Sequence, residues 1–388
     1  MRLLHVVPTY LPARRYGGPI FAVHGLCRAL AARGHEVEVY TTSIDGPHDS
    51  RVPHCEPVML DGVKVRYFAS PGLRRLSYAP ALGRALRDAM ANYDVAHLHS
   101  VFLWPTWQAA RSAQSANVPY VISPRGMLVK RLIEGRNRFV KTAWIALIER
   151  SNLERAAAVH LTSDLERCEL ERFGWPLKRL IVAPNAIEEV DDAVHDALSP
   201  DIAALAGGGP LALFFGRLAR VKGLDRLLRA FAQTELGVLA IVGNDYENLA
   251  TELLQLASAL NVRERVRLVT RTVSGSDKEY VFALARVLVL PSYSESFGNT
   301  VLEALQRGIP AIVTPEVGAA EAVAKSGGGL VVDGAAVPLS AAIASLLDDP
   351  ARAAAMGEAG RQYVRRHYSW QGVAGQMEAL YKELCIAR

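Results

Sequence analysis

Short runs of β-branched residues alternate with segments of helical periodicity along nearly the whole chain. This alternation is typical of parallel sheets flanked by helices, because two parallel strands need a long crossover that is usually helical. In the first half, the pattern predicts strands at residues 3–7, 37–41, 63–68, 95–98, 120–123, 158–162 and 180–183. In the second half, it predicts strands at residues 211–215, 238–242, 266–269, 287–290, 311–313 and 330–332. The fold class that follows is α/β.

The alternation lapses once, between residues 184 and 210, where acidic and small residues replace it. We interpret this lapse as a linker between two domains. The predicted division is an N-terminal domain at 1–188, a linker at 189–209, a C-terminal domain at 210–366, and a helix at 367–388 that packs back on the first domain. Two such α/β units joined by a hinge are expected to hold a ligand cleft between them, facing the carboxyl ends of the strands.

Composition excludes several classes of protein. Half of the 388 residues are apolar and 21% are charged, which argues against a disordered chain and a small disulfide scaffold. The four cysteines are widely spaced and form no C-x-x-C pair, so neither disulfides nor a zinc site is predicted, and buried free thiols are expected. The chain begins without the apolar region of a signal peptide and has no membrane-spanning apolar stretch. We therefore expect a cytosolic protein.

Positive charge is concentrated in residues 125–150, which we call the basic segment. It holds seven lysines and arginines against two glutamates, an excess equal to the net charge of +5 of the whole chain. Apolar residues such as Phe139 and Trp144 lie between the charges, so an anionic membrane surface is a candidate partner. The alternative is a solvated helix face. Nucleic acid is not expected as a partner, because the cluster is short and no recognisable binding module accompanies it.

Two cations follow the first strand of the second half. That strand, 211–215, leads into Gly216 and Arg217, and Lys222 and Gly223 follow before a helix. A loop at the carboxyl end of a strand is suited to holding a diphosphate, with the arginine bidentate and the lysine a mobile point charge. The alternative is a pair of ordinary surface cations.

Two glutamates accompany a predicted helix further along the chain. A glycine at position 298 indicates that this helix begins near Asn299 or Thr300. Glu295 then lies on the preceding loop, and Glu303, eight residues later, lies in the second turn. The helix N-terminus offers N–H groups and a positive dipole end to a phosphate, while carboxylates can accept hydrogen bonds from sugar hydroxyls. The alternative is a capping glutamate and a surface glutamate.

These motifs together resemble the family 4 glycosyltransferases, which are retaining enzymes with the GT-B fold. The resemblance extends over almost the full length of the chain. Further similar features are Gly17 with Gly18, the 32–37 segment, the strand end at 94–99, Pro184 with Asn185, and Gly318 with Glu321. The stretch from Ser123 to Leu128 is similar to the branch that builds bacterial exopolysaccharides and lipopolysaccharides. The fold that this resemblance implies is two Rossmann-like domains facing each other across a cleft.

The resemblance implies that Arg217 and Lys222 hold the diphosphate of a nucleotide-sugar donor. Gly17 and Gly18 would let the backbone approach the same phosphates without a side chain in the way. Glu295 would bind the donor sugar. Breaking the bond between sugar and phosphate leaves charge on a nucleoside diphosphate, and preorganised cations lower that barrier. Arg217, Lys222 and Glu295 are accordingly the predicted catalytic residues.

By the same resemblance, Glu303 would accept from the nucleotide ribose, and backbone amides near Asn299 and Thr300 would touch sugar or phosphate. The implied activity is transfer of a hexose to a glycan or lipid-linked acceptor, with retention at the anomeric carbon, in the synthesis of bacterial surface polysaccharide. No cofactor is implied. No metal is expected either, because the Asp-x-Asp triplet of metal-dependent glycosyltransferases does not occur in the sequence.

The acceptor side departs from the family pattern. Many relatives have a histidine after the strand equivalent to 120–123, whereas this chain has Ser123, Pro124 and Arg125 there. The acceptor-side role is therefore left to His99 or Arg125. Both residues also have an alternative, purely structural interpretation.

Other enzyme classes are excluded by missing motifs. No G-x-G-x-x-G opens a helix, no P-loop lysine follows a glycine, and no H-E-x-x-H occurs, which argues against a dinucleotide dehydrogenase, an NTPase and a zinc protease. Two alternatives to a transferase stay open. One is a GT-B epimerase or hydrolase that acts on the nucleotide sugar alone, and the other is an inactive glycosyltransferase-like scaffold. The presence of all four charged donor-site residues argues against the scaffold.

Overall fold

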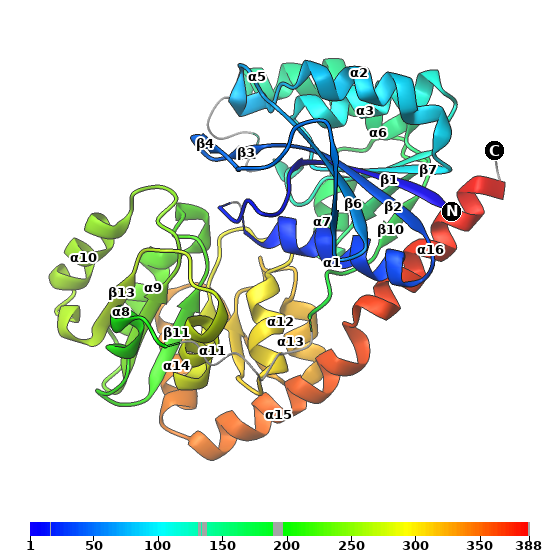
Figure 1. The fold of residues 1–388 in the computed structure, drawn as a ribbon. Helices are drawn as coiled ribbons and strands as arrows, with labels where there is room; N and C mark the ends of the chain where they lie inside the picture. The colour runs from blue at the N-terminus through cyan, green and yellow to red at the C-terminus, as the bar shows by residue number, and fades with distance from the viewer. Residues whose placement is uncertain (16, 131–132, 134–137, 189–196, 387–388) are drawn as a thin grey trace. The chain divides into compact units, whose positions relative to one another are not determined.

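The computed structural model describes all of the chain except residues 16, 131–132, 134–137, 189–196 and 387–388 (Figure 1). The chain divides into two compact units. Unit 1 comprises Met1–Asn185 and Trp370–Arg388, and unit 2 comprises Ala186–Ser369. The helix expected at the C-terminus thus belongs to unit 1 from Trp370 onward.

Unit 1 is built on an eight-stranded sheet in the order β10-β9-β8-β7-β1-β2-β6-β5. Its strands are β1 (Arg2–Thr9), β2 (Glu36–Thr42), β5 (Pro57–Leu60), β6 (Val63–Phe68), β7 (Val95–His99), β8 (Tyr120–Ser123), β9 (Ala158–Leu161) and β10 (Leu180–Val182). Every neighbouring pair is parallel except β5 with β6. A short hairpin, β3 (Ile44–Asp45) with β4 (His48–Asp49), follows β2.

Helices cover both faces of the unit 1 sheet. They are α1 (Gly18–Ala32), α2 (Pro80–Ala89), α3 (Trp104–Ser115), α5 (Arg138–Trp144), α6 (Arg150–Arg155), α7 (Asp164–Glu171) and α16 (Trp370–Ile386). Leu4, Val6 and Leu98 belong to the apolar core on the side of α2 and α3. Because side chains alternate along a strand, His5 and His97 point to the other face, where α16 packs against α1 and β7 (Figure 1).

Unit 2 is built on a six-stranded parallel sheet in the order β13-β12-β11-β14-β15-β16. The strands are β11 (Leu211–Phe215), β12 (Val238–Val242), β13 (Val266–Val269), β14 (Ala285–Leu290), β15 (Ala311–Val313) and β16 (Gly329–Val331). The helices are α8 (Pro200–Ala203), α9 (Leu224–Phe231), α10 (Ala250–Ala259), α11 (Gly275–Leu284), α12 (Asn299–Gln306), α13 (Ala320–Ser326), α14 (Ala336–Leu347) and α15 (Pro350–His367). Strands such as β12 are buried along their whole length, as expected for a parallel sheet covered on both faces.

The two sheets share one connection pattern. In unit 2 the chain starts at β11, adds β12 and β13 on one side, and then crosses to β14 on the other side. In unit 1 the chain likewise starts at β1, adds β2 and β6 on one side, and then crosses to β7 on the other side. This is the Rossmann order, in which ligands bind outside the carboxyl ends of the strands where the direction reverses. The loops after β1 and β7, and after β11 and β14, are therefore the places to search for function.

The predicted strands all occur, with bounds that differ by at most two residues, and the α/β fold class is confirmed. The predicted linker needs a correction. Its first residues, 189–196, lie outside the described part, but residues 197–209 include α8, whose Ile202 lies with Leu205 in the apolar core of unit 2. Hydrogen bonds from Ser199 to the carboxylate of Asp277 on α11 anchor the segment as well, so it is part of unit 2 rather than a linker.

The expectation of buried thiols is correct only for Cys27. Cys55 and Cys168 are exposed, and Cys385 is half-buried. A cysteine carries too small an apolar surface to decide burial by itself, so its place follows that of its element. Among the described helices, none is both long enough and apolar enough to cross a membrane.

Candidate active site

The loop after β11 carries the two predicted cations of the donor site. Gly216 N–H donates to the carbonyl oxygen of Val242 at 3.0 Å, which ties the start of this loop to the end of β12. The guanidinium carbon of Arg217, the next residue, lies 5.2 Å from the centre of the Tyr246 ring. Because an aromatic face attracts a cation, this contact holds the arginine at the carboxyl edge of the sheet.

A sharp turn ends this loop just after Lys222. Gly223 takes a left-handed φ of 69° and precedes the first residue of α9. A Cβ atom at this position would overlap the carbonyl oxygen of Pro291, the first residue after β14, so only glycine fits without a shift of the backbone. Tyr293 N–H donates to the carbonyl oxygen of Val221 at 2.8 Å. The loops after β11 and β14, which flank the reversal of strand order, are thereby joined.

Lys222 and Glu295 form an ion pair between these two loops. Each side chain is 16% exposed, so the pair is shielded from most of the solvent but remains reachable. An ammonium group offers three donors and moves on a flexible stem, so an incoming phosphate oxygen can take the place of the carboxylate. The structure therefore brings one predicted cation together with one predicted carboxylate.

The segment that leads into α12 is fixed by backbone hydrogen bonds. Glu295 N–H donates to the carbonyl oxygen of Glu316, and the carbonyl oxygen of Glu295 accepts from Gly318 N–H, both at 2.9 Å. The N-cap residue of α12 is a glycine with a φ of 96°, and the helix begins at Asn299, as predicted. The backbone of Asn299 and Thr300 therefore lies at the positive end of the helix dipole, which favours an anion such as phosphate.

Glu303 lies in the second turn of α12, as predicted, and its partner is a residue that sequence reasoning missed. Lys278 on α11 places its Nζ atom 3.0 Å from Oε2 of Glu303. Nothing in the sequence distinguishes Lys278 from a surface lysine, because the contact depends on how α11 packs beside α12. Tyr246, which lies under Arg217, is missed for the same reason.

Gly17 and Gly18 lie in unit 1 where β1 gives way to α1. Gly17 is the N-cap residue of this helix, with a φ of 69°, and Gly18 is its first residue. Neither residue carries a side chain, so bare backbone forms the start of the helix after the central strand of the sheet.

The two acceptor-side candidates, His99 and Arg125, are in contact with each other. His99 ends β7, and its Nδ1 atom lies 3.3 Å from Nη2 of Arg125. Arg125 Nη1 also donates to Oδ1 of Asn185 at 2.8 Å. Burial lowers the pKa of Arg125 to about 10, so the group stays a cation at neutral pH. The sequence presents these residues as alternatives, whereas the structure joins them.

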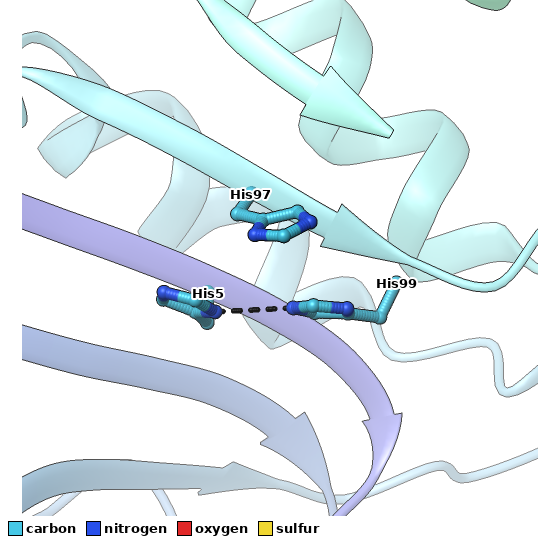
Figure 2. Close-up of side chains that lie close together, drawn as sticks. All are labelled: His5, His97 and His99. Carbon is cyan, nitrogen blue, oxygen red and sulfur yellow. Dashed lines mark hydrogen bonds between the residues drawn. The ribbon is translucent and has the colours of Figure 1, made fainter. Parts of the chain in front are cut away.

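Figure 2 shows His99 beside His5 from β1, with His97 next to both. Nε2 of His99 and Nδ1 of His5 are hydrogen-bonded at 3.0 Å. Because a guanidinium can only donate, Nδ1 of His99 is the acceptor for Arg125, and the proton of this neutral ring is on Nε2. His99 therefore donates to His5, whose own proton is on Nε2. That Nε2 atom is buried and has no hydrogen-bond partner in the described part of the chain.

A second chain of hydrogen bonds runs through the other two buried imidazoles. His160 Nε2 lies 2.8 Å from the carbonyl oxygen of Ala183, which can only accept, so His160 donates there. Nδ1 of His160 then accepts from Nε2 of His97 at 3.3 Å, and Nδ1 of His97 accepts from the hydroxyl of Tyr381 at 2.6 Å. Tyr381 belongs to α16, so this second chain ties the C-terminal helix to the sheet of unit 1.

The three histidines of Figure 2 resemble a metal centre, since one nitrogen from each lies within 4.8 Å of the others. The hydrogen bonds argue against a metal there, because the lone pair of each of the three rings already accepts a hydrogen bond and the Arg125 cation is adjacent. Burial lowers the pKa of His5 to about 3 and holds those of His97 and His99 well below the ordinary value. We interpret the cluster as a neutral hydrogen-bond network and assign no metal to it.

Comparisons with known proteins agree with this architecture. Residues 17–186 match the model of the glycosyl transferase 4-like domain, and residues 180–363 match that of the glycosyl transferases group 1. The two matches follow one another and together span most of the chain. The chain belongs to the family 4-type glycosyltransferases. It is therefore an enzyme of the glycosyltransferase class, as the sequence predicts.

Individual relatives extend the comparison. D-inositol 3-phosphate glycosyltransferase from Kineococcus radiotolerans is 29% identical, with 88% of this chain and 85% of that protein covered. Among solved structures, Anabaena HepE in complex with UDP-glucose has a TM-score of 0.74 and 18% identity, with 99% of this chain and 100% of that chain covered. WaaG, a glycosyltransferase involved in lipopolysaccharide biosynthesis, has a TM-score of 0.69 and 19% identity, with 96% and 98% covered. These likenesses confirm the predicted GT-B fold.

The comparisons assign no role to single residues of this glycosyltransferase. The donor-site roles stay predictions for Gly17, Gly18, Arg217, Lys222, Glu295, Asn299, Thr300 and Glu303, as do the acceptor-side roles of His99 and Arg125. Independence from metals stays a prediction as well.

Proposed function

We propose that the enzyme transfers a sugar, with retention at the anomeric carbon, from a nucleoside diphosphate donor to a hydroxyl group of an acceptor. The observation that carries this proposal is the pair of Lys222 and Glu295 beside the N-terminus of α12, where the strand order of unit 2 reverses. A diphosphate needs cations and N–H donors, and a sugar needs hydrogen-bond acceptors. Both kinds of group lie on the same two loops. The UDP-glucose complex of HepE, a protein of similar fold, supports this class of donor.

In the reaction, the bond between the anomeric carbon and the phosphate oxygen breaks, and the diphosphate leaves with the electron pair. The acceptor oxygen forms the new bond on the same face of the sugar, and its proton passes to a phosphate oxygen of the donor. No protein base is required. Arg217 and Lys222 stabilise the charge that develops on the diphosphate. When phosphate replaces Glu295 as the partner of Lys222, the Glu295 carboxylate becomes available to the hydroxyls of the donor sugar.

The other donor groups have supporting roles. Glu303 accepts from the ribose hydroxyls, and the backbone at Asn299 and Thr300 stabilises phosphate or sugar through the helix dipole. Gly17 and Gly18 form a second turn through which backbone alone approaches the donor. No metal takes part in this scheme, because the cations and the helix N-terminus meet the diphosphate charge.

On the acceptor side we assign the contact to Arg125. The lone pair of His99 on Nδ1 accepts from Arg125, so His99 acts as a proton acceptor only if this hydrogen bond breaks, and the charged ring would then lie beside the Arg125 cation. Arg125 is partly exposed and remains a cation, which suits a phosphorylated or polyhydroxylated acceptor. His99 is then the group that orients Arg125.

We further propose a glycan or lipid-linked acceptor for bacterial surface polysaccharide, reached from the cytosolic side of an anionic membrane. The reported role of WaaG in lipopolysaccharide biosynthesis supports this acceptor class. In the basic segment, Lys130 is exposed, and the apolar side chains of Phe139 and Leu147 are 77% and 79% exposed. Such a mixture of exposed cations and apolar groups suits a lipid headgroup surface. Arg131, Arg136 and the side chain of Arg138 lie outside the described residues.

A thermal-shift panel of nucleotide sugars, followed by product analysis, tests the proposal. A true donor at 100 times its dissociation constant stabilises the protein by about 2.7 kcal/mol. With that donor, glycosylated product is expected only when an acceptor is present, and inositol phosphate belongs in the acceptor panel because of the Kineococcus relative. An altered or hydrolysed sugar without acceptor would identify an epimerase or hydrolase instead. A panel without any shift would contradict nucleotide-sugar binding.

A further inference from the structure

Two ion pairs join α11 and α12 on the side of the proposed nucleotide site. In the first, Arg307 donates from Nε to Oε2 of Glu279 at 2.7 Å and from Nη2 to Oε1 at 2.5 Å. In the second, Nζ of Lys278 lies 3.0 Å from Oε2 of Glu303. Lys278 and Glu279 are neighbours on α11, and Glu303 on α12 lies one turn before Arg307, the C-cap residue of that helix, so the two pairs form successive connections between the same helices.

The first pair has the larger number of contacts. Its arginine is bidentate, lies with its guanidinium carbon 4.9 Å from the centre of the Phe282 ring, and also donates from Nη1 to the carbonyl oxygen of Glu303 at 2.8 Å. A planar guanidinium held by two carboxylate oxygens and a carbonyl is fixed in one orientation. Lys278 makes only a single ion-pair contact with α12, so it adds little to a connection between the helices that Arg307 already makes.

Lys278 is nevertheless held in place. Its Nζ atom lies 5.8 Å from the centre of the Phe215 ring and 5.9 Å from that of Phe282, and its side chain is only 24% exposed. Phe215 is the last residue of β11, immediately before the loop that carries Arg217. The ammonium group therefore lies at the carboxyl edge of the sheet, between that strand end and the carboxylate of Glu303.

This arrangement leaves Glu303 ready for a ligand. A carboxylate has two oxygens with about four lone-pair positions, and Lys278 contacts only Oε2. Oε2 is buried, whereas the side chain as a whole is 27% exposed, so it is Oε1 that can meet ribose hydroxyls. Without Lys278, the carboxylate would sample several rotamers and would have to be ordered when the nucleotide binds.

We propose that Lys278 is a positioning residue of the nucleotide site, which fixes the Glu303 carboxylate in the orientation that accepts hydrogen bonds from the ribose. The inference rests on the proposed function, in which Glu303 contacts the ribose. It assigns to Lys278 a contribution to nucleotide affinity that depends on the ribose hydroxyls, in addition to any contribution to stability.

Calorimetry tests this inference with UDP, ADP and GDP, of which the tightest binder to the unaltered enzyme is compared with its 2′,3′-dideoxy analogue. Lys278→Met is expected to weaken the ribonucleotide about tenfold and the dideoxynucleotide less than about twofold, because the analogue has no hydroxyl for Glu303 to bind. Lys278→Arg should restore most of the affinity. Glu279→Gln is the matched control: it weakens the neighbouring ion pair and should lower Tm while leaving the affinity for the ribonucleotide unchanged.

The results distinguish the proposed function of the site from the positioning role of Lys278. If none of the three nucleotides binds, or if Glu303→Ala leaves ribonucleotide affinity intact, the proposed function of the site is wrong and the inference fails with it. If Glu303→Ala weakens the ribonucleotide but Lys278→Met does not, the proposed function stands and only the inference is overturned. Equal losses for ribonucleotide and dideoxynucleotide in Lys278→Met would also overturn it, because the lysine would then act on the diphosphate or on the fold.

Discussion

Unit 1 and unit 2 share a strand order but present different chemistry near the place where that order reverses. In unit 1, the strands on either side of the reversal carry His5 and His99, which belong to a neutral network with Arg125 as its single cation. In unit 2, the loops on either side of it carry Lys222 and Glu295, which form an ion pair. Topology therefore fixes where a site can lie, and the residues near the strand ends decide what the site can do.

Burial explains why the two regions differ. His5 is fully buried and His99 nearly so, and a charged imidazole there would lose its hydration without an anion in return. Except at Nε2 of His5, the ring nitrogens are therefore satisfied by directed hydrogen bonds that leave every ring neutral. The side chains of Lys222 and Glu295 are each 16% exposed, so both charges keep part of their hydration. Each group can also exchange its partner for a ligand. The buried histidines of unit 1 thus keep fixed partners, whereas the ion pair of unit 2 can exchange its partners for a ligand.

The largest expected effect is acid unfolding of unit 1. The folded pKa values of His5 and His160 are lowered to about 3 by burial, whereas an unfolded histidine titrates near about 6.5. Below that pH the unfolded chain binds more protons than the folded one, so stability falls as the pH falls. Each buried histidine costs about 1.4 kcal/mol per pH unit in this window, and the four histidines of the network together cost several kcal/mol by pH 5.5.

Tryptophan fluorescence reports the unfolding of unit 1 selectively, because all five tryptophans belong to that unit. Urea midpoints at pH 7.5, 6.5 and 5.5 should fall steeply below pH 6.5. His5→Gln, whose amide oxygen can still accept from His99, should make the slope shallower by about 1.4 kcal/mol per pH unit. The matched control is His48→Gln, an exposed position, which should leave the slope unchanged. A stability that is constant between pH 7.5 and 5.5 would contradict the neutral network.

The next effect concerns the exchangeable pair of unit 2. Lys222→Ala should lower turnover by about 100-fold or more while Tm stays nearly unchanged, because the ammonium stabilises the leaving diphosphate rather than the fold. Arg220→Ala is the control, since Arg220 belongs to the same short helix but is 68% exposed and pairs with Glu252. Steady-state kinetics of both variants decide the matter. Activity of Lys222→Ala within a few-fold of the unaltered enzyme would remove Lys222 from the catalytic set.

The two carboxylates should separate binding from turnover. Glu303→Ala is expected to weaken free nucleoside diphosphate by about 1.5 to 3 kcal/mol, the range of a hydrogen bond to a charged group. Glu295→Ala should leave that affinity nearly intact and lower turnover with the full donor, because it positions the sugar. Calorimetry of both variants with and without EDTA checks this division. Equal losses of affinity in the two variants would overturn it, and loss of binding in EDTA would overturn the metal-free site.

Sequence reasoning succeeded where a property is local. The strand at 211–215 is an unbroken apolar run, and the helix start at Asn299 follows from the glycine before it, so both were predicted correctly. It missed β5, Pro57–Leu60, which is an antiparallel edge strand with half of its residues exposed and only four residues long. A short edge strand gains its hydrogen bonds from a partner rather than from a pattern of its own.

The candidate site divides in the same way. Lys222 and Glu295 were predicted from their places after two strands, and their contact follows from the neighbouring positions of β11 and β14. Lys278 was missed because its role depends on the packing of two helices. The histidine network was missed too, although His97 and His99 alternate along one strand. The rings that complete it, His5 and His160, come from distant parts of the chain.

The smallest expected effect lies in the basic segment, which differs from both sites because it is proposed to meet a surface rather than a small ligand. Replacing Lys130, Arg131, Arg136 and Arg138 with glutamine should reduce sedimentation with anionic liposomes, and added salt should do the same to the unaltered enzyme. Each cation near such a surface contributes about 1 kcal/mol, and several weak contacts add up to a reversible association.

The control must remove the same charge elsewhere. Four exposed arginines of unit 2 serve this purpose when replaced with glutamine: Arg229, Arg352, Arg365 and Arg366. If this variant loses as much liposome binding as the basic-segment variant, only net charge matters and the segment has no special role. Leu147→Ser tests the apolar contribution to membrane binding. The Leu147 side chain is 79% exposed, and it contributes to binding only if it enters the headgroup layer. Binding that survives all of these changes would leave the segment as a solvated helix face.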